Sequence, residues 1–170
     1  SGEAKVASSL NGVTWSEVAL PLDAAWADGV YGNGKFVLVA TDTDVVASSA
    51  DGVTWTANGS IPDDTDGGSD STTSSWASIT YGKGKYLAVS YTDLATATST
   101  NGITWTRHDT ALPNTGNGTW FNVAYGNNRF VAVTTDGQTA YSFDGITWYE
   151  STALPSLEAG FEPDTSNAIK

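Results

Sequence analysis

Cysteine and methionine are absent from this chain, and glutamate and lysine are scarce, with five of each among 170 residues. The absence of cysteine excludes disulfide bonds and thiolate metal sites. Strong helix formers are few, and no run has apolar residues spaced three and four apart, so helices are not expected. No apolar stretch is long enough to cross a bilayer as a helix, so membrane insertion is not expected either. The scarcity of helix formers and the lack of helical apolar spacing favour an all-β chain.

Positive charge is also scarce. Seven lysine and arginine residues stand against 19 aspartate and glutamate residues, which gives a net charge of −12. Such a surface repels the phosphates of nucleic acids and of anionic membranes, so we expect neither as a partner. Charged residues make up only 15% of the chain. Threonine, serine, asparagine, aspartate and glycine take their place, as is typical of proteins rich in strands and turns.

What the chain has instead is a repeat. Three segments run from a Tyr-Gly pair to a tryptophan 24, 24 and 23 residues later, over 31–55, 81–105 and 125–148, and a half copy ends at Trp15. Constant length within units and variable length between them is typical of repeated small sheets joined by free loops. We interpret the repeat-defining residues as structural: Trp15, Trp55, Trp105, Trp148, Asn11, Asp51, Asn101, Asp144, Trp26, Trp76, Trp120, Tyr31, Tyr81 and Tyr125.

Each full unit is predicted to contain four strands. In the first unit they cover 26–31, 35–40, 45–49 and 54–58, and the half copy has strands at 5–9 and 14–18. Asn-Gly and Asp-Gly pairs mark the turns before each closing tryptophan, because both residues tolerate positive φ. The second strand, Lys35-Phe-Val-Leu-Val-Ala40, is apolar on both faces. Such a strand must be covered on both sides, which predicts sheets stacked face to face.

The spacing divides the chain into six parts. They are a half unit at 1–20 (third and fourth strands), a unit at 21–58, a polar loop at 59–75, units at 76–110 and 111–150, and a divergent tail at 151–170.

Four segments carry a resemblance to a known family: Ser9-Leu-Asn-Gly-Val-Thr-Trp15, Ser49-Ala-Asp-Gly-Val-Thr-Trp55, Ser99-Thr-Asn-Gly-Ile-Thr-Trp105 and Ser142-Phe-Asp-Gly-Ile-Thr-Trp148. They resemble the Asp-box of the BNR repeats found in sialidase-like β-propellers, and with the Tyr-Gly strands the match covers about residues 5–150. The common Asp-box has one residue between Asp and Gly, whereas here Gly follows directly, and two copies have Asn. The resemblance is strongest to repeat arrays of secreted bacterial proteins and of phage tail or fibre proteins.

The resemblance implies a β-propeller-like fold with three complete four-stranded blades and an N-terminal half blade, that is, a partial propeller. Propellers usually close with four to eight blades, so we expect further blades of a longer chain, or other copies of this chain, to complete it. In the family the box lies away from the active-site face and its role is structural. We therefore expect Trp15, Trp55, Trp105 and Trp148 to be largely buried at equivalent positions.

Candidate catalytic residues are few. The sialidase site holds a carboxylate with three arginines, and this chain has only Arg107 and Arg129. Arg129 occupies the repeat position of Lys35 and Lys85, where a charge guards a hydrophobic strand against aggregation. His108 is the only histidine, and no nucleophile motif surrounds it. The sequence therefore predicts no catalytic residue and no sialidase activity.

Five aromatic residues outside the repeat-defining positions remain for a binding surface: Phe121, Tyr91, Tyr141, Tyr149 and Phe143. Of these, Tyr91, Tyr141 and Phe121 are the candidate ligand contacts, and stacking on a sugar is the contact expected. Asp64, Asp66 and Asp70 lie at short spacings in a Gly-containing loop, which makes calcium the one cofactor to consider. The alternative for this cluster is a solvated acidic loop. The spacer 59–75 is the longest, and we expect it to contact any ligand.

These observations lead to one leading hypothesis and two alternatives. The leading hypothesis is a non-enzymatic structural, receptor-recognition or glycan-recognition module of an extracellular or virion assembly such as a phage tail. Its partners would be other protein subunits or further blades, and a glycan or cell-surface receptor. The alternatives are a glycoside hydrolase acting through carboxylates of the rim loops, and an assembly-factor propeller that binds another protein.

Overall fold

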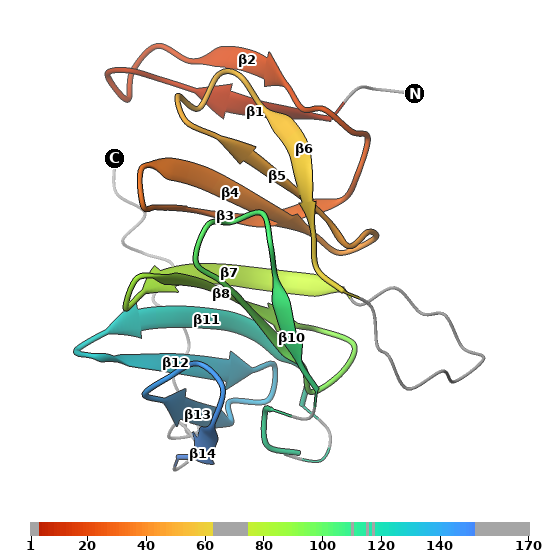
Figure 1. The fold of residues 1–170 in the computed structure, drawn as a ribbon, viewed down its shortest axis with the longest axis vertical. Coiled ribbons are helices and arrows are strands. Elements are labelled where there is room, and N and C mark those ends of the chain that lie inside the picture. The colour runs from red at the N-terminus through yellow and green to blue at the C-terminus, as the bar shows by residue number, and fades with distance from the viewer. Residues whose placement is uncertain (1–3, 63–74, 110, 115, 117, 152–170) are drawn as a thin grey trace, which may run out of the picture.

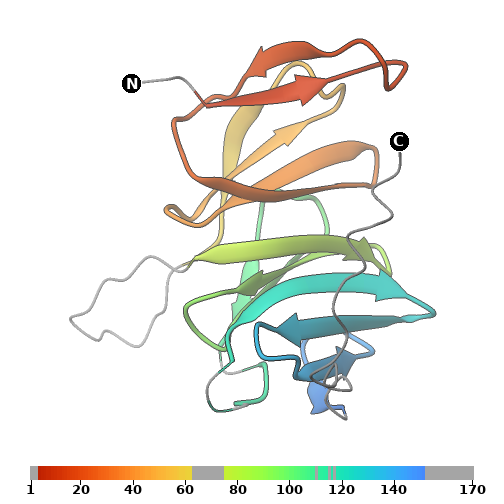
Figure 2. The same cartoon turned by 180° about the vertical axis from the view of Figure 1, so that it is seen from behind.

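The computed structural model describes residues 4–62, 75–109, 111–114, 116 and 118–151, and within these ranges it contains strands and turns but no helix (Figure 1). Three antiparallel sheets have four strands each, in the order in which they follow along the chain, and one sheet has two. The four-stranded sheets stack face to face through their first strands, as successive blades of a β-propeller do (Figures 1 and 2). The fold is thus a partial propeller of three blades and a half blade.

The elements follow the repeat. The half blade is β1 (Lys5–Ser8) and β2 (Ser16–Ala19). Blade 1 comprises β3 (Trp26–Gly32), β4 (Lys35–Ala40), β5 (Val45–Ser49) and β6 (Thr56–Ser60). Blade 2 comprises β7 (Trp76–Gly82), β8 (Lys85–Ser90), β9 (Thr96–Ser99) and β10 (Thr106–His108). Blade 3 comprises β11 (Trp120–Gly126), β12 (Arg129–Thr134), β13 (Thr139–Ser142) and β14 (Trp148–Glu150).

Two kinds of turn join these strands. The turns between first and second strands are tight, with positive φ at both central residues, for example 46° at Asn33 and 78° at Gly34. The turns between third and fourth strands are longer, and in them only the glycine has positive φ, as Gly52 does at 74°. Asp51 and its equivalents tolerate positive φ but do not adopt it in these turns. The aspartate or asparagine acts there as a hydrogen-bond acceptor instead.

The core lies between the blades. One buried cluster joins blades 1 and 2 and includes Val37, Trp76, Tyr86 and Trp105, and a second joins blades 2 and 3. The central strand β8 faces both clusters: Tyr86 and Ala88 belong to the first, Leu87 and Val89 to the second. This confirms for blade 2 that an apolar second strand is covered on both faces.

The closing tryptophans are not equally buried. Trp105 and Trp148 are only 5% and 8% exposed, Trp55 is half-buried, and Trp15 is 62% exposed. The prediction that all four are largely buried was wrong for Trp15. Trp105 lies in the core between blades 1 and 2, whereas Trp15 belongs to a sheet with no first or second strand and no preceding blade in the described residues.

Candidate functional site

The turn between the third and fourth strands has the same hydrogen bonds in every sheet. In blade 1, the Oδ1 atom of Asp51 accepts from the amides of Val53 (2.8 Å) and Thr54 (2.7 Å), and the hydroxyl of Ser49 accepts from the amide of Gly52. Asn11, Asn101 and Asp144 accept the equivalent pairs through Oδ1. Because only one side-chain oxygen is used, Asn and Asp are interchangeable here.

The charge on the two aspartates is stabilised by this geometry. Backbone amides of Thr54 and Val53 lower the pKa of Asp51 from 3.8 to about 2. For Asp144, partial burial works in the opposite direction, but the amides of Ile146 and Thr147 outweigh it and lower the pKa. Both carboxylates therefore serve the turn as anions, which gives them a structural role.

Adjacent blades are joined by a contact between a tyrosine and a glycine. A Cβ atom on Gly32 would lie 2.2 Å from the ring of Tyr81, and one on Gly82 would lie 2.2 Å from the ring of Tyr125. The tyrosines of blades 2 and 3 thus pack on the glycine of the preceding blade's Tyr-Gly pair, where a larger residue would have no room. The hydroxyl of Tyr86 also donates to the carbonyl of Gly32.

The same pairs of blades share a second contact farther out. In blades 2 and 3, the glycine of the turn between the third and fourth strands, called the Asx turn below, packs on an aliphatic residue of the preceding blade's second strand. A Cβ on Gly102 would approach Val37 to 2.7 Å, and one on Gly145 would approach Leu87 to 2.4 Å. Hydrogen bonds also cross the interface between blades 2 and 3, where Lys83 and Lys85 donate to the carbonyls of Phe143 (2.9 Å) and Asp144 (3.0 Å).

A third set of contacts joins the first strands, and it is polar. Asp28 Oδ2 accepts from the hydroxyl of Ser78 (2.7 Å) and the amide of Ile79 (3.0 Å), and the hydroxyl of Ser78 accepts in turn from the amide of Val123 (3.3 Å). A register shift precedes Asp28 and Ser78 in their strands, and re-aims these side chains toward the next blade. Specific hydrogen bonds therefore set the stacking register of the blades.

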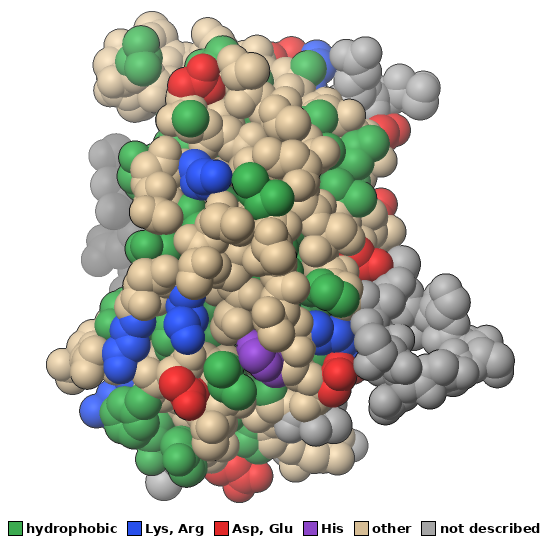
Figure 3. Space-filling model, viewed as in Figure 1, with side chains coloured by type: hydrophobic (Ala, Val, Ile, Leu, Met, Phe, Trp, Pro, Cys, Tyr) green, Lys and Arg blue, Asp and Glu red, His purple; other side chains and the backbone are tan. Residues whose placement is uncertain are grey.

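The two ends of the stack expose what the interior covers. Large hydrophobic side chains that are more than one-third exposed lie mostly on the half blade, blade 1 and blade 3. They are Leu10, Val13, Trp15, Leu22, Tyr31, Phe36 and Val53 at one end and Phe121, Val131, Phe143, Ile146 and Tyr149 at the other; blade 2 contributes only Tyr91. Figure 3 shows hydrophobic side chains gathered near the blade 3 end, beside lysine and arginine side chains.

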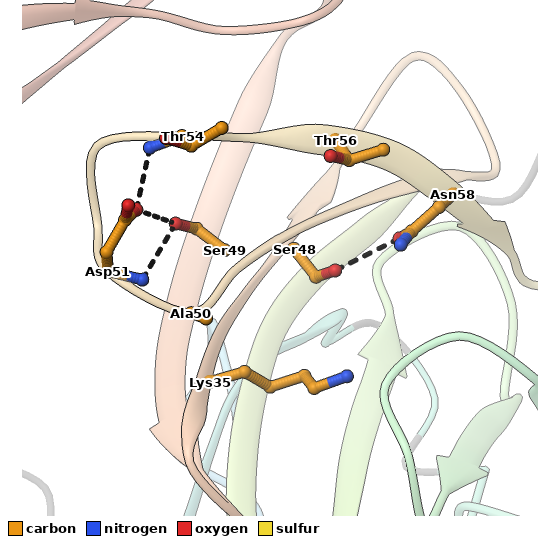
Figure 4. A pocket seen from close by; sticks show the side chains of 8 residues that line it. All are labelled: Lys35, Ser48, Ser49, Ala50, Asp51, Thr54, Thr56 and Asn58. Carbon is orange, nitrogen blue, oxygen red and sulfur yellow. Dashed lines mark hydrogen bonds between the residues drawn. The ribbon is translucent and has the colours of Figure 1, made fainter.

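Blades 1 and 2 each have a hydroxyl-rich groove along their outer strands. In blade 1 it has a volume of about 310 Å³ and is lined by Lys35 and by Ser48, Thr56 and Asn58 (Figure 4). Ser48 donates to the side-chain oxygen of Asn58 at 3.0 Å. The equivalent groove of blade 2 has about 430 Å³ and is lined by Lys85, Thr98 and Thr106, among others. Repeated lysine and hydroxyl groups can hydrogen-bond a polar ligand, but they supply no nucleophile with an adjacent base.

Blade 3 has aromatic residues at the same repeat positions. Tyr141 stands where Ser48 and Thr98 do, Phe143 where Ala50 does, and Tyr149 where Thr56 does. The rings of Tyr141 and Tyr149 stack with centroids 5.5 Å apart, and the guanidinium of Arg129 lies 5.8 Å from Tyr141 and 5.6 Å from Phe143. This aromatic cluster, defined here as Arg129, Tyr141, Phe143 and Tyr149, is the strongest candidate binding surface.

Sequence reasoning identified part of this cluster. Tyr141 was a predicted ligand contact, and Phe143 and Tyr149 were among the residues expected to remain for a binding surface. The contribution of Arg129 was missed, because its proximity to these rings appears only in the fold. Phe121 is 41% exposed on β11, and Tyr91 is 45% exposed in the turn after β8. The three predicted contacts lie on separate elements, and the only aromatic partners of Tyr141 in the described ranges are Phe143 and Tyr149.

Two side chains of types common in catalytic sites, those of Arg107 and His108, make structural contacts instead. The side chain of Arg107 is 5% exposed, pairs with Asp93 at 2.8 Å and with Asp109, and lies 5.7 Å from the ring of Trp76. Burial opposes its charge, but hydrogen bonds to Asp109 and Asp93 outweigh this and raise the pKa of Arg107. His108 Nε2 lies 2.9 Å from the hydroxyl of Thr98, and burial together with the nearby Lys85 lowers the pKa of His108.

No metal site is found in the part of the chain that the structure describes, where no three His, Cys, Asp or Glu side chains are grouped to hold an ion. The predicted calcium ligands Asp64, Asp66 and Asp70 lie outside the described residues, as does most of the spacer 59–75. Those two predictions therefore remain predictions. The described residues also contain no helix that is long and apolar enough to cross a membrane.

The fold and its inter-blade contacts define the class of protein: an all-β chain of the β-propeller type. No family model matches the sequence, and no curated protein matches it either. Among solved structures, the chain is similar to YCF48 from Cyanidioschyzon merolae, with 21% identity and a TM-score of 0.59 over 80% of this chain and 39% of that one. A virginiamycin B lyase from Staphylococcus aureus matches with 16% identity and a TM-score of 0.71, over 91% of this chain and 50% of the lyase.

A second structure, described as YCF48 bound to D1 peptide, matches with 18% identity and a TM-score of 0.51, over 84% of this chain and 44% of that one. At these identities the likeness establishes the fold alone. The chain spans half or less of the length of these three chains.

Proposed function

We propose that this chain is a non-enzymatic, protein-binding β-propeller module. The observation that carries the proposal is the concentration of exposed hydrophobic side chains on the two ends of the blade stack. Tyr149 and Phe143 are each 49% exposed at one end and Tyr31 is 57% exposed at the other. Apolar patches of this kind, bordered by polar residues, are typical of protein–protein interfaces. That a neighbour of similar fold has been solved with a bound peptide is in line with this proposal.

The aromatic cluster is the proposed contact on blade 3. Tyrosine, phenylalanine and arginine are the residues enriched where protein partners contribute most binding energy. The guanidinium of Arg129 lies beside the rings of Tyr141 and Phe143, so a cationic and an aromatic contact are available at one place. The finer part of the proposal places the module in an extracellular or virion assembly, where this cluster or the hydroxyl-rich grooves contact a receptor or its glycans. The acidic, hydroxyl-rich surface supports that setting.

The enzymatic alternative, a glycoside hydrolase, has less in its favour. Such enzymes need two carboxyl groups facing a shared substrate site. Within the described residues Asp51 and Asp144 are occupied by turn amides and Asp93 by Arg107. The carboxylate Asp28 holds the first strand of blade 2. A carboxylate that is bonded in this way within the fold is poorly placed to act as the acid or base of a glycoside hydrolase.

The proposal is tested by a photo-crosslinking amino acid placed at Tyr149, with a matched variant at Tyr91, which has similar exposure on the internal blade. The full chain is incubated with extract of the cells or particles that produce it, and adducts are mapped by mass spectrometry. We expect protein adducts at position 149 that greatly exceed those at position 91. Adducts at neither position, or hydrolysis of chromogenic glycosides by the purified chain, would overturn the proposal.

A further inference from the structure

Three of the seven basic side chains lie around one turn of blade 3, between β13 and β14. The amines of Lys83 and Lys85 lie 2.9 and 3.0 Å from the carbonyls of Phe143 and Asp144. The guanidinium of Arg129 lies 5.6 Å from the ring of Phe143. Although the chain has 19 acidic residues, no ion pair within the described ranges includes any of these three cations. Positive charge is thus concentrated here without a carboxylate partner in that part of the chain.

The acidic residue of this turn is already engaged. Asp144 Oδ1 accepts from the amides of Ile146 and Thr147 and so closes the Asx turn. The two lysines contact backbone carbonyls of the turn and not this carboxylate. An ammonium group has three N–H donors, so each lysine retains donors for an acceptor that comes from outside.

Lys83 occupies a position at which the turn itself favours another residue. Its φ is 51°, in the left-handed region, and the equivalent residues of blades 1 and 3 are Asn33 and Asn127, with φ of 46° and 45°. Asparagine adopts this region more readily than lysine does, because its short polar side chain can hydrogen-bond locally. The geometry of the turn therefore does not account for a lysine here, and its charge beside Phe143 is the feature that distinguishes blade 2.

The aromatic rings beside these cations occupy positions that are exposed in each blade. Phe143 and Tyr149 are each 49% exposed. Their equivalents in blade 2, Thr100 and Thr106, are exposed as well, although blade 3 packs against that blade. The exposure of the two rings is thus a property of their place within the blade and does not depend on what precedes or follows it. We define the basic–aromatic patch as Lys83, Lys85, Arg129, Phe143 and Tyr149; lysine and arginine side chains lie beside hydrophobic ones at this end of the molecule (Figure 3).

The charge of the remaining surface limits what this patch can bind. A long polyanion such as a nucleic acid would extend from the patch onto the surface of a chain of net charge −12, where like charges repel it. A short segment with a few carboxylates can be held by the three cations alone. The exposed rings are covered only if the segment also has an apolar side chain, which a carboxylated sugar lacks. The ligand chemistry that fits both features is an acidic peptide with an apolar residue.

We propose that the basic–aromatic patch binds an acidic peptide segment of a partner protein, in which carboxylates flank an aromatic or aliphatic residue. This deepens the proposed protein-binding function and rests on it. Arg129 holds one carboxylate through paired N–H···O bonds, and Lys83 and Lys85 supply the charge for the others. The apolar residue packs against Phe143 and Tyr149. Because these cations are near the surface, binding is strongest at low ionic strength.

The probe is a display library of short randomised peptides, selected against the full chain at about 0.05 M salt. We expect the selected sequences to be enriched in aspartate and glutamate around an aromatic or aliphatic residue. A labelled peptide of the selected consensus is then titrated against the chain by fluorescence anisotropy. Its Kd should rise about tenfold or more when the salt concentration is raised to about 0.5 M, because salt screens exposed ion pairs.

Matched variants locate the site. Lys83→Asn combined with Arg129→Gln should weaken binding of the consensus peptide by about tenfold or more. The control Lys5→Gln removes one positive charge from the half blade, where Lys5 pairs with Glu17, and should leave Kd unchanged. Lys83→Asn introduces the residue that blades 1 and 3 have in this turn, so the fold is kept. Tyr149→Thr introduces the residue of blades 1 and 2 and should weaken binding through the lost apolar contact.

Three results would overturn the inference: selected peptides without enrichment in acidic residues, a Kd that does not respond to salt, or equal binding by Arg129→Gln and Lys5→Gln. Binding of carboxylated glycans that depends on Arg129, with no peptide selected, would also overturn it, because the ligand would then be a sugar. Protein crosslinks at Tyr149 test the broader function separately. If they form and the double variant of Lys83 and Arg129 leaves them unchanged, the acidic-peptide inference fails while the protein-binding function stands.

Discussion

The blade 2 interfaces and the ends of the stack contain the same residue types, yet they differ in what those residues do. In the interior, Tyr81 covers Gly32 and Tyr125 covers Gly82, so both partners of the contact are present. At the ends, each contact is represented by one partner only. Tyr31 is exposed, and a Cβ on Gly126 would meet nothing within 4 Å. The repeat therefore encodes an interface whose occupation depends on position in the stack.

The same comparison separates blade 3 from the two blades before it. The grooves of blades 1 and 2 are lined by lysine and hydroxyl groups, whereas blade 3 has Arg129 and three aromatic rings at the equivalent positions. Repeat positions that no neighbouring blade contacts have different residues in different blades. Repeat positions that a neighbouring blade contacts have glycine, tyrosine or an aliphatic residue. The blades therefore differ mainly at positions that face outward, and binding specificity is expected at these positions.

The largest effect should come from truncating the closing tryptophans. Trp105→Ala leaves a cavity in the core between blades 1 and 2 and should lower the free energy of unfolding by about 3–5 kcal/mol. Trp15→Ala, on the half blade, should cost less than about 1 kcal/mol, because that indole is 62% exposed. Denaturant unfolding of both variants measures the difference. Equal losses would mean that the half blade is covered in solution.

A smaller effect is expected from adding one methyl group to the Tyr-Gly pairs. Gly82→Ala forces its Cβ into the ring of Tyr125 and should destabilise the protein by about 2 kcal/mol. Gly126→Ala has open space and should stay within about 0.5 kcal/mol of wild type. Neither glycine has positive φ, so the pair isolates packing from backbone strain. Thermal melts of the two variants should separate clearly, and coincident melts would contradict the interlocking contact.

Tyr86→Phe should have a more modest effect. It removes the hydroxyl that donates to the carbonyl of Gly32 across the interface between blades 1 and 2, at a cost of about 1 kcal/mol. Phe36 and Phe130 are the natural residues at the same position, so the ring itself should pack without change. Burial raises the pKa of Tyr86 to about 12. In an alkaline absorbance titration the wild type should therefore show a late-ionising tyrosine that the variant lacks.

The smallest effect should be the pH response of the Asx turns. The pKa of Asp51 is about 2 in the fold and 3.8 ordinarily, so its contribution to stability is present above pH 4 and is lost as the pH falls toward 2. Asp51→Asn keeps the acceptor used by Asn11 and Asn101 but cannot titrate. The variant should melt like wild type at pH 7 and lose less stability in acid. Identical acid profiles would show that the turn does not depend on the charge.

Much of the local structure could be predicted because it depends on neighbours along the chain. The strands of blade 1 were expected at 26–31, 35–40 and 45–49, and the structure has them at 26–32, 35–40 and 45–49. The fourth strand was expected to begin at Thr54 but begins at Thr56, because the amide of Thr54 bonds to Asp51 in the turn. The sequence predicted a structural role for Asp51 but not its hydrogen bonds, because an acceptor in an Asx turn and a residue with positive φ leave similar sequence signals.

The candidate site could be predicted only in part. Tyr141 stood out because it interrupts a repeat, but its stacking on Tyr149 and its contact with Arg129 depend on the pairing of β12, β13 and β14. Tyr91 and Phe121 stood out for the same reason and lie on other elements. A residue that departs from the repeat indicates a position without a structural role. Only the folded structure shows which of these positions lie next to one another.

By itself, the sequence determined the repeat, the four strands of each unit and the turns between them, because hydrogen bonds within a few residues specify these features. It did not determine which copies are buried. Trp15 and Trp105, like Tyr31 and Tyr81, occupy equivalent positions in their units, yet one of each pair is exposed and the other is covered. Burial depends on what lies opposite in space. Whether a neighbouring blade stands there was decided by the tertiary structure alone.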